Sequence, residues 1–269
     1  MKKIVYLIVT FTLIQLSFAQ TYEEVGKQVG VGDHFALDTR EMSGGLVVFD
    51  YDNDGYEDIF VTGGLLNHSA LFKNMKNGTF KNVYASSGIV ISVHDQTVGA
   101  AAADLDNDGD KDLVVTTFER ADPYLFENRD GKFYNITSIA GLEAKIWNTA
   151  VSFIDFDLDG DLDMYFSSYV GGNGDCDRNF FYENMGNMKF KEIAQELGVA
   201  DKGCSLASTF SDYDNDGDFD LLVANDFGLT VQSNKIFENM YPERKFVDVS
   251  ENSGFNARIF GMGIEGGDF

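Results

Sequence analysis

The sequence predicts an all-β protein: a β-propeller built from four-stranded blades. Three observations carry this prediction. First, the 269 residues include 28 glycines, 14% aromatic residues and 2 prolines, a composition typical of short strands joined by tight turns. Second, one Asp-rich loop recurs four times, with first positions 54, 51 and 57 residues apart. Third, four short apolar or small-residue runs accompany each copy, as the strands of one blade would.

Residues 1–19 have the features of a cleavable secretory signal. Two lysines stand near the start, residues 4–18 are mainly apolar, and Ser17 and Ala19 supply small residues before the cut. We therefore expect the mature chain to begin at Gln20 and to be secreted, so that it is extracellular, on the cell surface or in a periplasm. No other stretch is long and apolar enough to predict a transmembrane span.

The strands of each unit can be placed in order around the Asp-rich loop, and are named a to d here. Strand a precedes the loop, strand b follows it, strand c ends in an aromatic-x-Asn signature, and strand d closes the unit. The runs are 45–49, 98–103, 150–154 and 206–210 for a; 59–61, 113–115, 164–166 and 221–223 for b; 72–74, 126–128, 182–184 and 237–239 for c; 80–83, 133–136, 190–193 and 246–249 for d.

These runs predict one propeller domain over residues 20–269. Its blades lie at about 44–84, 97–137, 148–194 and 205–250, and residues 260–269 begin a further blade. A lone blade cannot bury both faces of its sheet, so neighbouring blades must stack around an axis. Because the chain ends inside the first strand of a fifth unit, we expect the four complete blades to be part of a seven-bladed ring.

The loop itself reads Asp-x-Asp-x-Asp-Gly-x-x-Asp, with acids at positions 1, 3, 5 and 9 and a glycine at position 6. Position 7 can add its backbone carbonyl. The candidate metal ligands are Asp50, Asp52, Asp54, Tyr56 and Asp58 in the first copy; Asp104, Asp106, Asp108, Asp110 and Asp112 in the second; Asp155, Asp157, Asp159, Asp161 and Asp163 in the third; and Asp212, Asp214, Asp216, Asp218 and Asp220 in the fourth.

Hard oxygen donors in a flexible, mostly carboxylate cage suit Ca²⁺ better than Mg²⁺, which demands a strict octahedron and keeps its waters. One copy alone could be an ordinary Asp-Gly turn, but four in register predict about four calcium sites. The loop is not an EF-hand, because position 12 is an apolar residue of strand b instead of a bidentate Glu. We expect the Asp at position 9 to take the bidentate role, and binding to be coupled to folding.

The formal net charge of −24 argues against nucleic-acid binding, which leaves a basic footprint. The three histidines, His34, His68 and His94, are scattered, and neither a nucleophile elbow nor a zinc motif is present. We therefore predict no catalytic residues and no organic cofactor. The alternative is a propeller-fold carbohydrate-active enzyme, a polysaccharide lyase or glycoside hydrolase in which calcium is purely structural. A deep axial pocket with paired acids that do not bind metal would favour this alternative.

The Asp loops resemble the calcium sites of FG-GAP/VCBS propeller repeats, as in integrin α-subunit propellers. The phrases at 71–74 with 79–83, and at 125–128 with 133–142, are similar to a bacterial family whose propellers precede an ASPIC/UnbV domain and which is related to cartilage acidic protein. The resemblance covers residues 21–269, without the ASPIC/UnbV region. It implies a calcium-stabilised extracellular scaffold for binding or cell adhesion, with the ligand on the face opposite calcium.

Strand alternation puts the a–b and c–d turns on one face and the b–c and d–a connections on the other. The b–c connections are longer in units three and four, around 169–178 and 226–234. Since variable loops on a rigid scaffold often carry binding, we expect an extracellular protein or glycan partner there. Trp147, His94 and Arg258 fall on the same face.

The two cysteines, Cys176 and Cys204, fall on this face in adjacent blades. They are either two unpaired small residues or a disulfide, which the geometry and export of the chain would permit.

Overall fold

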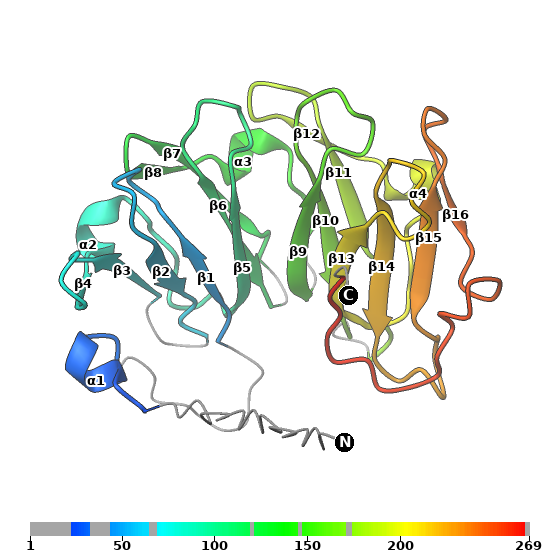
Figure 1. The fold of residues 1–269 in the computed structure, drawn as a ribbon, viewed down its shortest axis with the longest axis horizontal. Coiled ribbons are helices and arrows are strands. Elements are labelled where there is room, and N and C mark those ends of the chain that lie inside the picture. The colour runs from blue at the N-terminus through cyan, green and yellow to red at the C-terminus, as the bar shows by residue number, and fades with distance from the viewer. Residues whose placement is uncertain are drawn as a thin grey trace, which may run out of the picture.

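The fold is a row of four antiparallel sheets that stand side by side in chain order (Figure 1). The computed structural model describes residues 23–32, 44–64, 69–118, 121–144, 147–170 and 174–266. The expected signal segment 1–19 lies outside these residues. In each sheet the strands follow one another as a simple meander, which confirms the all-β fold class and the four-stranded blades expected from the repeat.

The strands of all four sheets follow the order a to d. The first sheet contains β1 (Leu46–Phe49), β2 (Asp58–Val61), β3 (Ala70–Asn74) and β4 (Phe80–Asn82). The second contains β5 (Thr97–Ala103), β6 (Asp112–Thr117), β7 (Tyr124–Arg129) and β8 (Lys132–Asn135). The third contains β9 (Asn148–Ile154), β10 (Asp163–Ser168), β11 (Phe180–Asn184) and β12 (Phe190–Glu192). The fourth contains β13 (Ser205–Ser211), β14 (Asp220–Asn225), β15 (Lys235–Asn239) and β16 (Phe246–Asp248).

The hydrophobic core lies between the sheets, because the central strands are buried on both faces. Successive residues of β6 point in opposite directions. Val114 packs with Met164 and Phe166 of the third sheet, whereas Leu113 packs with Phe60 of the first. Side chains of the third and fourth sheets pack against each other in the same way. Because the second strand of each sheet is buried on both faces, its sequence is a continuous apolar run.

The first strand of each sheet touches the first strand of the next, which requires small side chains. A Cβ on Gly99 would lie 2.7 Å from the carbonyl oxygen of Thr149 in β9, too close for any larger residue. Between β9 and β13, the hydroxyl of Ser152 donates to the carbonyl of Ser208 over 2.8 Å. Glycine, alanine and serine in these strands are therefore a consequence of close inter-sheet packing.

One-turn helices follow the last strand of the first three sheets and were not expected from the sequence. They are α2 (Tyr84–Ser87), α3 (Thr137–Ala140) and α4 (Ala194–Leu197), and α1 (Gly26–Val29) precedes the first sheet. Each ends at a glycine in the left-handed region. Gly88 has φ +92°, and a Cβ there would lie 2.4 Å from the carbonyl oxygen of Phe133, so this turn fits against the next sheet only as glycine.

The C-terminal segment returns to the fourth sheet. The amide of Gly261 donates to the carbonyl of Asn225 over 3.0 Å. Residues 251–266 contain no strand, and 267–269 lie outside the described residues, so the further blade expected at 260–269 stays a prediction. Among the described residues, no helix combines the length and the apolar character that a membrane span requires.

Candidate metal centre

The four Asp loops share one backbone conformation. Position 4 and the glycine at position 6 both have left-handed backbone angles in every copy, with φ of 56° for Leu158 and 97° for Gly160 in the third. These two residues turn the chain around the first carboxylate. Asp155 accepts the amide of Asp159 on Oδ1 and the amide of Gly160 on Oδ2, each over 3.0 Å. The first Asp of the other three loops accepts the same two amides.

The ninth Asp anchors the loop to strand c. Asp163 is buried, and its carboxylate accepts the amide of Phe156 over 3.2 Å and the amide of Asn184 over 2.7 Å. The corresponding pairs recur at Asp58, Asp112 and Asp220. Both oxygens therefore already bind backbone donors, a structural role that the sequence does not reveal. Whether this Asp also binds an ion through both oxygens stays a prediction.

Carboxylate oxygens come together in every loop. Groups of three whose oxygens lie within 4.8 Å of one another occur in each copy: Asp50, Asp52 and Asp58; Asp104, Asp106 and Asp108; Asp155, Asp157 and Asp159; Asp212, Asp214 and Asp220. The first and third positions thus take part in all four groups, and the fifth or ninth completes each. An all-oxygen, carboxylate-rich set of this kind fits a hard divalent cation such as Ca²⁺.

The seventh positions, Tyr56, Asp110, Asp161 and Asp218, are absent from these groups. Instead, the side chains of Asp110 and Asp161 link neighbouring blades. The side-chain amide of Asn53 donates to Asp110 over 2.7 Å, and that of Asn107 donates to Asp161 over 2.8 Å. The first three loops are therefore linked from one blade to the next.

The third and fourth loops lack this link, because Leu158 stands where the other loops have Asn. Asp218 is 7% exposed, and its Oδ1 has no hydrogen-bond partner within the described part of the chain. Leu158 also holds a φ of +56°, which asparagine tolerates better than leucine. We expect Leu158→Asn to raise the free energy of unfolding by about 1 kcal/mol, measured by urea denaturation. Asn107→Leu should lower it by a similar amount. An unchanged or less stable Leu158→Asn variant would show that the bridge does not form.

The strand c signature has a second inter-blade role. The side-chain amide of Asn128 donates to the carbonyl of Tyr51 in the preceding loop over 2.8 Å, and that of Asn184 donates to Leu105 over 2.8 Å. Asn239 does the same to Phe156 over 3.1 Å. The aromatic-x-Asn phrase is visible in the sequence, but its partner lies about 80 residues away and cannot be found from the phrase alone.

Burial gives the ninth carboxyls unusual proton affinity. It raises the pKa of Asp163 to about 8, of Asp112 to about 7, and of Asp58 and Asp220 to about 6. In metal-free protein, the folded state then keeps protons that the unfolded chain releases near pH 4. These groups thus stabilise the fold at acid pH, and their contribution is lost as the pH rises from about 4 to about 8.

We therefore expect the urea midpoint of the metal-free protein to fall between pH 5 and pH 8, with a smaller fall in Asp163→Asn. Equal falls in both proteins would contradict the assignment to Asp163.

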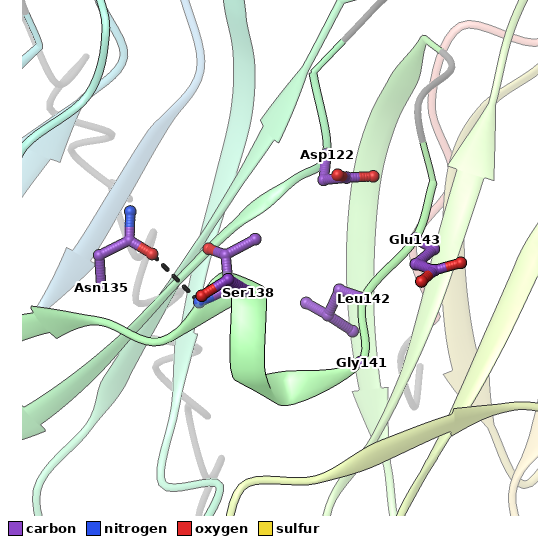
Figure 2. Close-up of a pocket in the computed structure, with 7 residues that line it drawn as sticks. Asp122, Asn135, Ser138, Gly141, Leu142 and Glu143 are labelled. Carbon is purple, nitrogen blue, oxygen red and sulfur yellow. Dashed lines mark hydrogen bonds between the residues drawn. The ribbon is translucent and has the colours of Figure 1, made fainter.

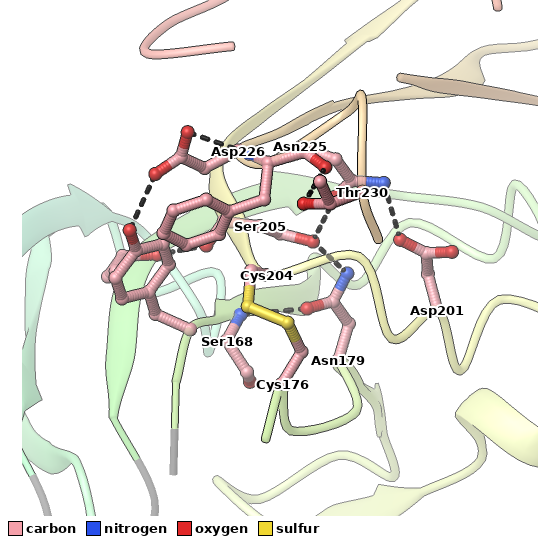
Figure 3. Close-up of a disulfide and its surroundings, with 12 residues drawn as sticks. Ser168, Cys176, Asn179, Asp201, Cys204, Ser205, Asn225, Asp226 and Thr230 are labelled. Atoms are coloured by element: carbon pink, nitrogen blue, oxygen red, sulfur yellow. Dashed lines mark hydrogen bonds between the residues drawn. A yellow bond between two sulfur atoms is a disulfide. The ribbon is translucent and has the colours of Figure 1, made fainter. Parts of the chain in front are cut away.

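The face opposite the Asp loops is held together by a disulfide and a polar network (Figure 3). Cys176, in the β10–β11 connection, is bonded to Cys204, just before β13, and their Cα atoms are 4.8 Å apart. Beside them, the amide of Asn179 donates to Ser205 over 2.8 Å, and Ser205 donates to Asn225 over 2.8 Å. The third and fourth blades are therefore joined covalently and by buried hydrogen bonds.

An aromatic row crosses the same face. Phe118 packs on Trp147 with ring centroids 4.4 Å apart, and Trp147 packs on Tyr169 at 4.9 Å. Tyr169 then stacks on Phe227, which contacts Phe260, both at 6.1 Å. Of these residues only Trp147 stands out in the sequence, because the others come from connections of different blades. The Tyr169 hydroxyl also donates to buried Asp226 over 2.6 Å.

A pocket of about 490 Å³ lies beside α3 (Figure 2). It contains two acids, Asp122 and Glu143, but Asp122 Oδ1 already accepts the amide of Ala144 over 3.1 Å. Helix α3 follows the outer strand β8, so this pocket is not the axial site that the enzyme alternative needs.

Comparison with known proteins agrees with the repeat. Residues 50–115 and 112–166 match the family model described as FG-GAP-like repeat. It is 28% identical over 160 residues to cartilage acidic protein 1 of Mus musculus and of Homo sapiens, matches that cover 58% of this chain. The chain spans 24% of the length of these relatives. A solved Agrocybe aegerita lectin, whose structure concerns recognition of non-reducing terminal N-acetylglucosamine, is 16% identical, with a TM-score of 0.43, covering 76% of this chain and 51% of the lectin.

Proposed function

We propose that this chain of FG-GAP-like repeats is a secreted, calcium-binding β-propeller that serves as an extracellular binding or adhesion module. The observation that carries the proposal is one loop geometry in four blades, each with three carboxylate oxygens within 4.8 Å of one another. Such a group repels itself without a cation, so its fourfold repetition supports a bound ion over a plain turn. The disulfide between Cys176 and Cys204 supports export to an oxidising compartment.

The first, third, fifth and ninth acids and the seventh carbonyl would hold Ca²⁺ between strands a and b. When bound, the ion supplies charge neutralisation and rigidity, with no chemistry of its own. The loops also contact one another through Asn53 with Asp110 and Asn107 with Asp161. Calcium would therefore stiffen the blade junctions as well as single blades, and the coupling of binding to folding follows from this arrangement.

The partner, an extracellular protein or glycan, would contact the opposite face. Two features support this proposal: the longer β10–β11 and β14–β15 connections, and the aromatic row to which they contribute Tyr169 and Phe227. Aromatic rings combine apolar contact area with low conformational entropy, as binding surfaces require. The disulfide and its network hold these connections in place, so the face is preformed.

Binding of the labelled protein to glycan and matrix-protein arrays tests the partner face. Leu229 is 62% exposed in the β14–β15 connection, and Met185 is 56% exposed in the β11–β12 turn on the calcium face. We expect Leu229→Arg to abolish a calcium-dependent array signal and Met185→Arg to retain it. Absence of any signal, or loss with Met185→Arg alone, would contradict the proposed partner and face.

A further inference from the structure

The first Asp loop differs from the other three in the charge beside it. The residue before the signature asparagine of strand c is Glu127, Glu183 or Glu238 in the second to fourth sheets, and Lys73 in the first. This position lies next to the Asp loop of its own sheet. One loop thus faces an ammonium group where the corresponding position of the others has a carboxylate.

The Lys73 ammonium reaches into the first loop. Its Nζ contacts the carboxylate of Asp52 and lies 2.9 Å from Oδ2 of Asp54. The side chains of Lys73, Asp52 and Asp54 are all at most one quarter exposed, so bulk water screens these contacts incompletely. The hydrogen bond from Lys73 lowers the pKa of Asp54, which keeps this carboxylate charged. Lys76 adds a second ammonium, 3.2 Å from the same Oδ2.

The second and third loops have the opposite electrostatics. Burial raises the pKa of Asp106 and of Asp157, the loop acids Asp108 and Asp159 raise it further, and Glu127 and Glu183 add smaller contributions. The carboxylates of Asp106 and Asp157 thus lie in surroundings with an excess of negative charge. Arg244 contacts Asp157 from the fourth sheet, but it also lies 2.6 Å from Glu183, which offsets its charge. In the described part of the chain, no ion pair involves an acid of the second or fourth loop.

We propose that the ammonium of Lys73 is the resident cation of the first loop, and that Ca²⁺ fills only the second, third and fourth. The inference rests on the proposed calcium-binding function and refines it. A calcium ion that bound Asp52 and Asp54 would sit within a few ångströms of the ammonium, or would have to expel it and break both ion pairs. The first blade therefore has a built-in substitute for the ion.

Calcium counting on the full chain tests this inference. The protein is stripped of metal, and its stoichiometry is measured by calorimetric titration with CaCl₂ and by elemental analysis after dialysis. We expect three ions for the wild type and four for Lys73→Glu, which recreates the charge of the other loops. Lys73→Gln, uncharged and similar in length, should also bind four ions. This variant replaces Lys73→Glu in the test if the added negative charge prevents metal-free Lys73→Glu from folding.

Lys81 provides the matched control, because it pairs with Lys73 across β3 and β4 but is exposed. Lys81→Glu makes the same change of charge in the same blade and should leave the count at three. Four ions in the wild type, or three in both Lys73 variants, would overturn the assignment of Lys73 while leaving calcium binding intact. No bound calcium in any folded variant would overturn the proposed function itself.

Discussion

Replacing the buried ninth acid of the third loop, Asp163→Ala, is expected to lower the free energy of unfolding by about 3 to 5 kcal/mol. The variant leaves the amides of Phe156 and Asn184 buried without an acceptor, and an unsatisfied buried donor costs about 1 to 3 kcal/mol each. A small cavity adds to this loss. The result follows from the anchoring of the loop to strand c, independent of any ion.

Urea denaturation in the presence of a calcium chelator is the appropriate measurement, since it separates the anchoring role from ion binding. Glu251→Ala, which removes an exposed acid, is the matched control and should change stability by less than about 0.5 kcal/mol. If Asp163→Ala were as stable as this control without calcium, the ninth acid would be a metal ligand only, and the anchoring role would be wrong.

Removal of the disulfide is the second large effect. Cys176→Ala with Cys204→Ala is expected to lower the free energy of unfolding by about 3.5 kcal/mol, because the bond closes a segment with a sequence separation of 28 residues in the unfolded chain. It also ties the β10–β11 connection to the strand that opens the fourth sheet. Loss of the bond should therefore loosen the partner face more than the calcium face.

Wild-type protein under reducing and oxidising conditions gives the comparison for this variant. Reduced wild type and the double variant should unfold at similar urea concentrations, both below oxidised wild type. A reductant that further destabilised the double variant, or equal stability of oxidised wild type and variant, would contradict a structural disulfide.

The fold could be predicted because the blade imposes its period on the sequence. Each unit needs one tight a–b loop, and the Gly160 turn with its flanking acids marks that loop plainly. The strand at 164–166 could be recognised because burial on both faces makes it continuously apolar. The one-turn helix α4 could not be recognised, because four residues are too few to establish a helical period.

The candidate site was only partly predictable, because the contacts that build it join residues that are far apart in the sequence. The sequence places Asp163 among the ligands, but not between the amides of Phe156 and Asn184. It shows Lys73 in the place of a glutamate, but not the ion pair with Asp52. The partners of Asn128 and Asn184 lie in the preceding blade. Such contacts depend on how sheets stack, and no local pattern encodes that stacking.

The most direct test of calcium-dependent folding is the melting temperature of the metal-free full chain with added CaCl₂, compared with MgCl₂. At a free calcium concentration one hundred times the dissociation constant, each filled site contributes about 2.7 kcal/mol to the free energy of unfolding. We predict a large rise in melting temperature with Ca²⁺ and little or none with Mg²⁺. A folded metal-free chain whose melting temperature does not respond to Ca²⁺ would contradict the calcium sites and reduce the Asp loops to turns.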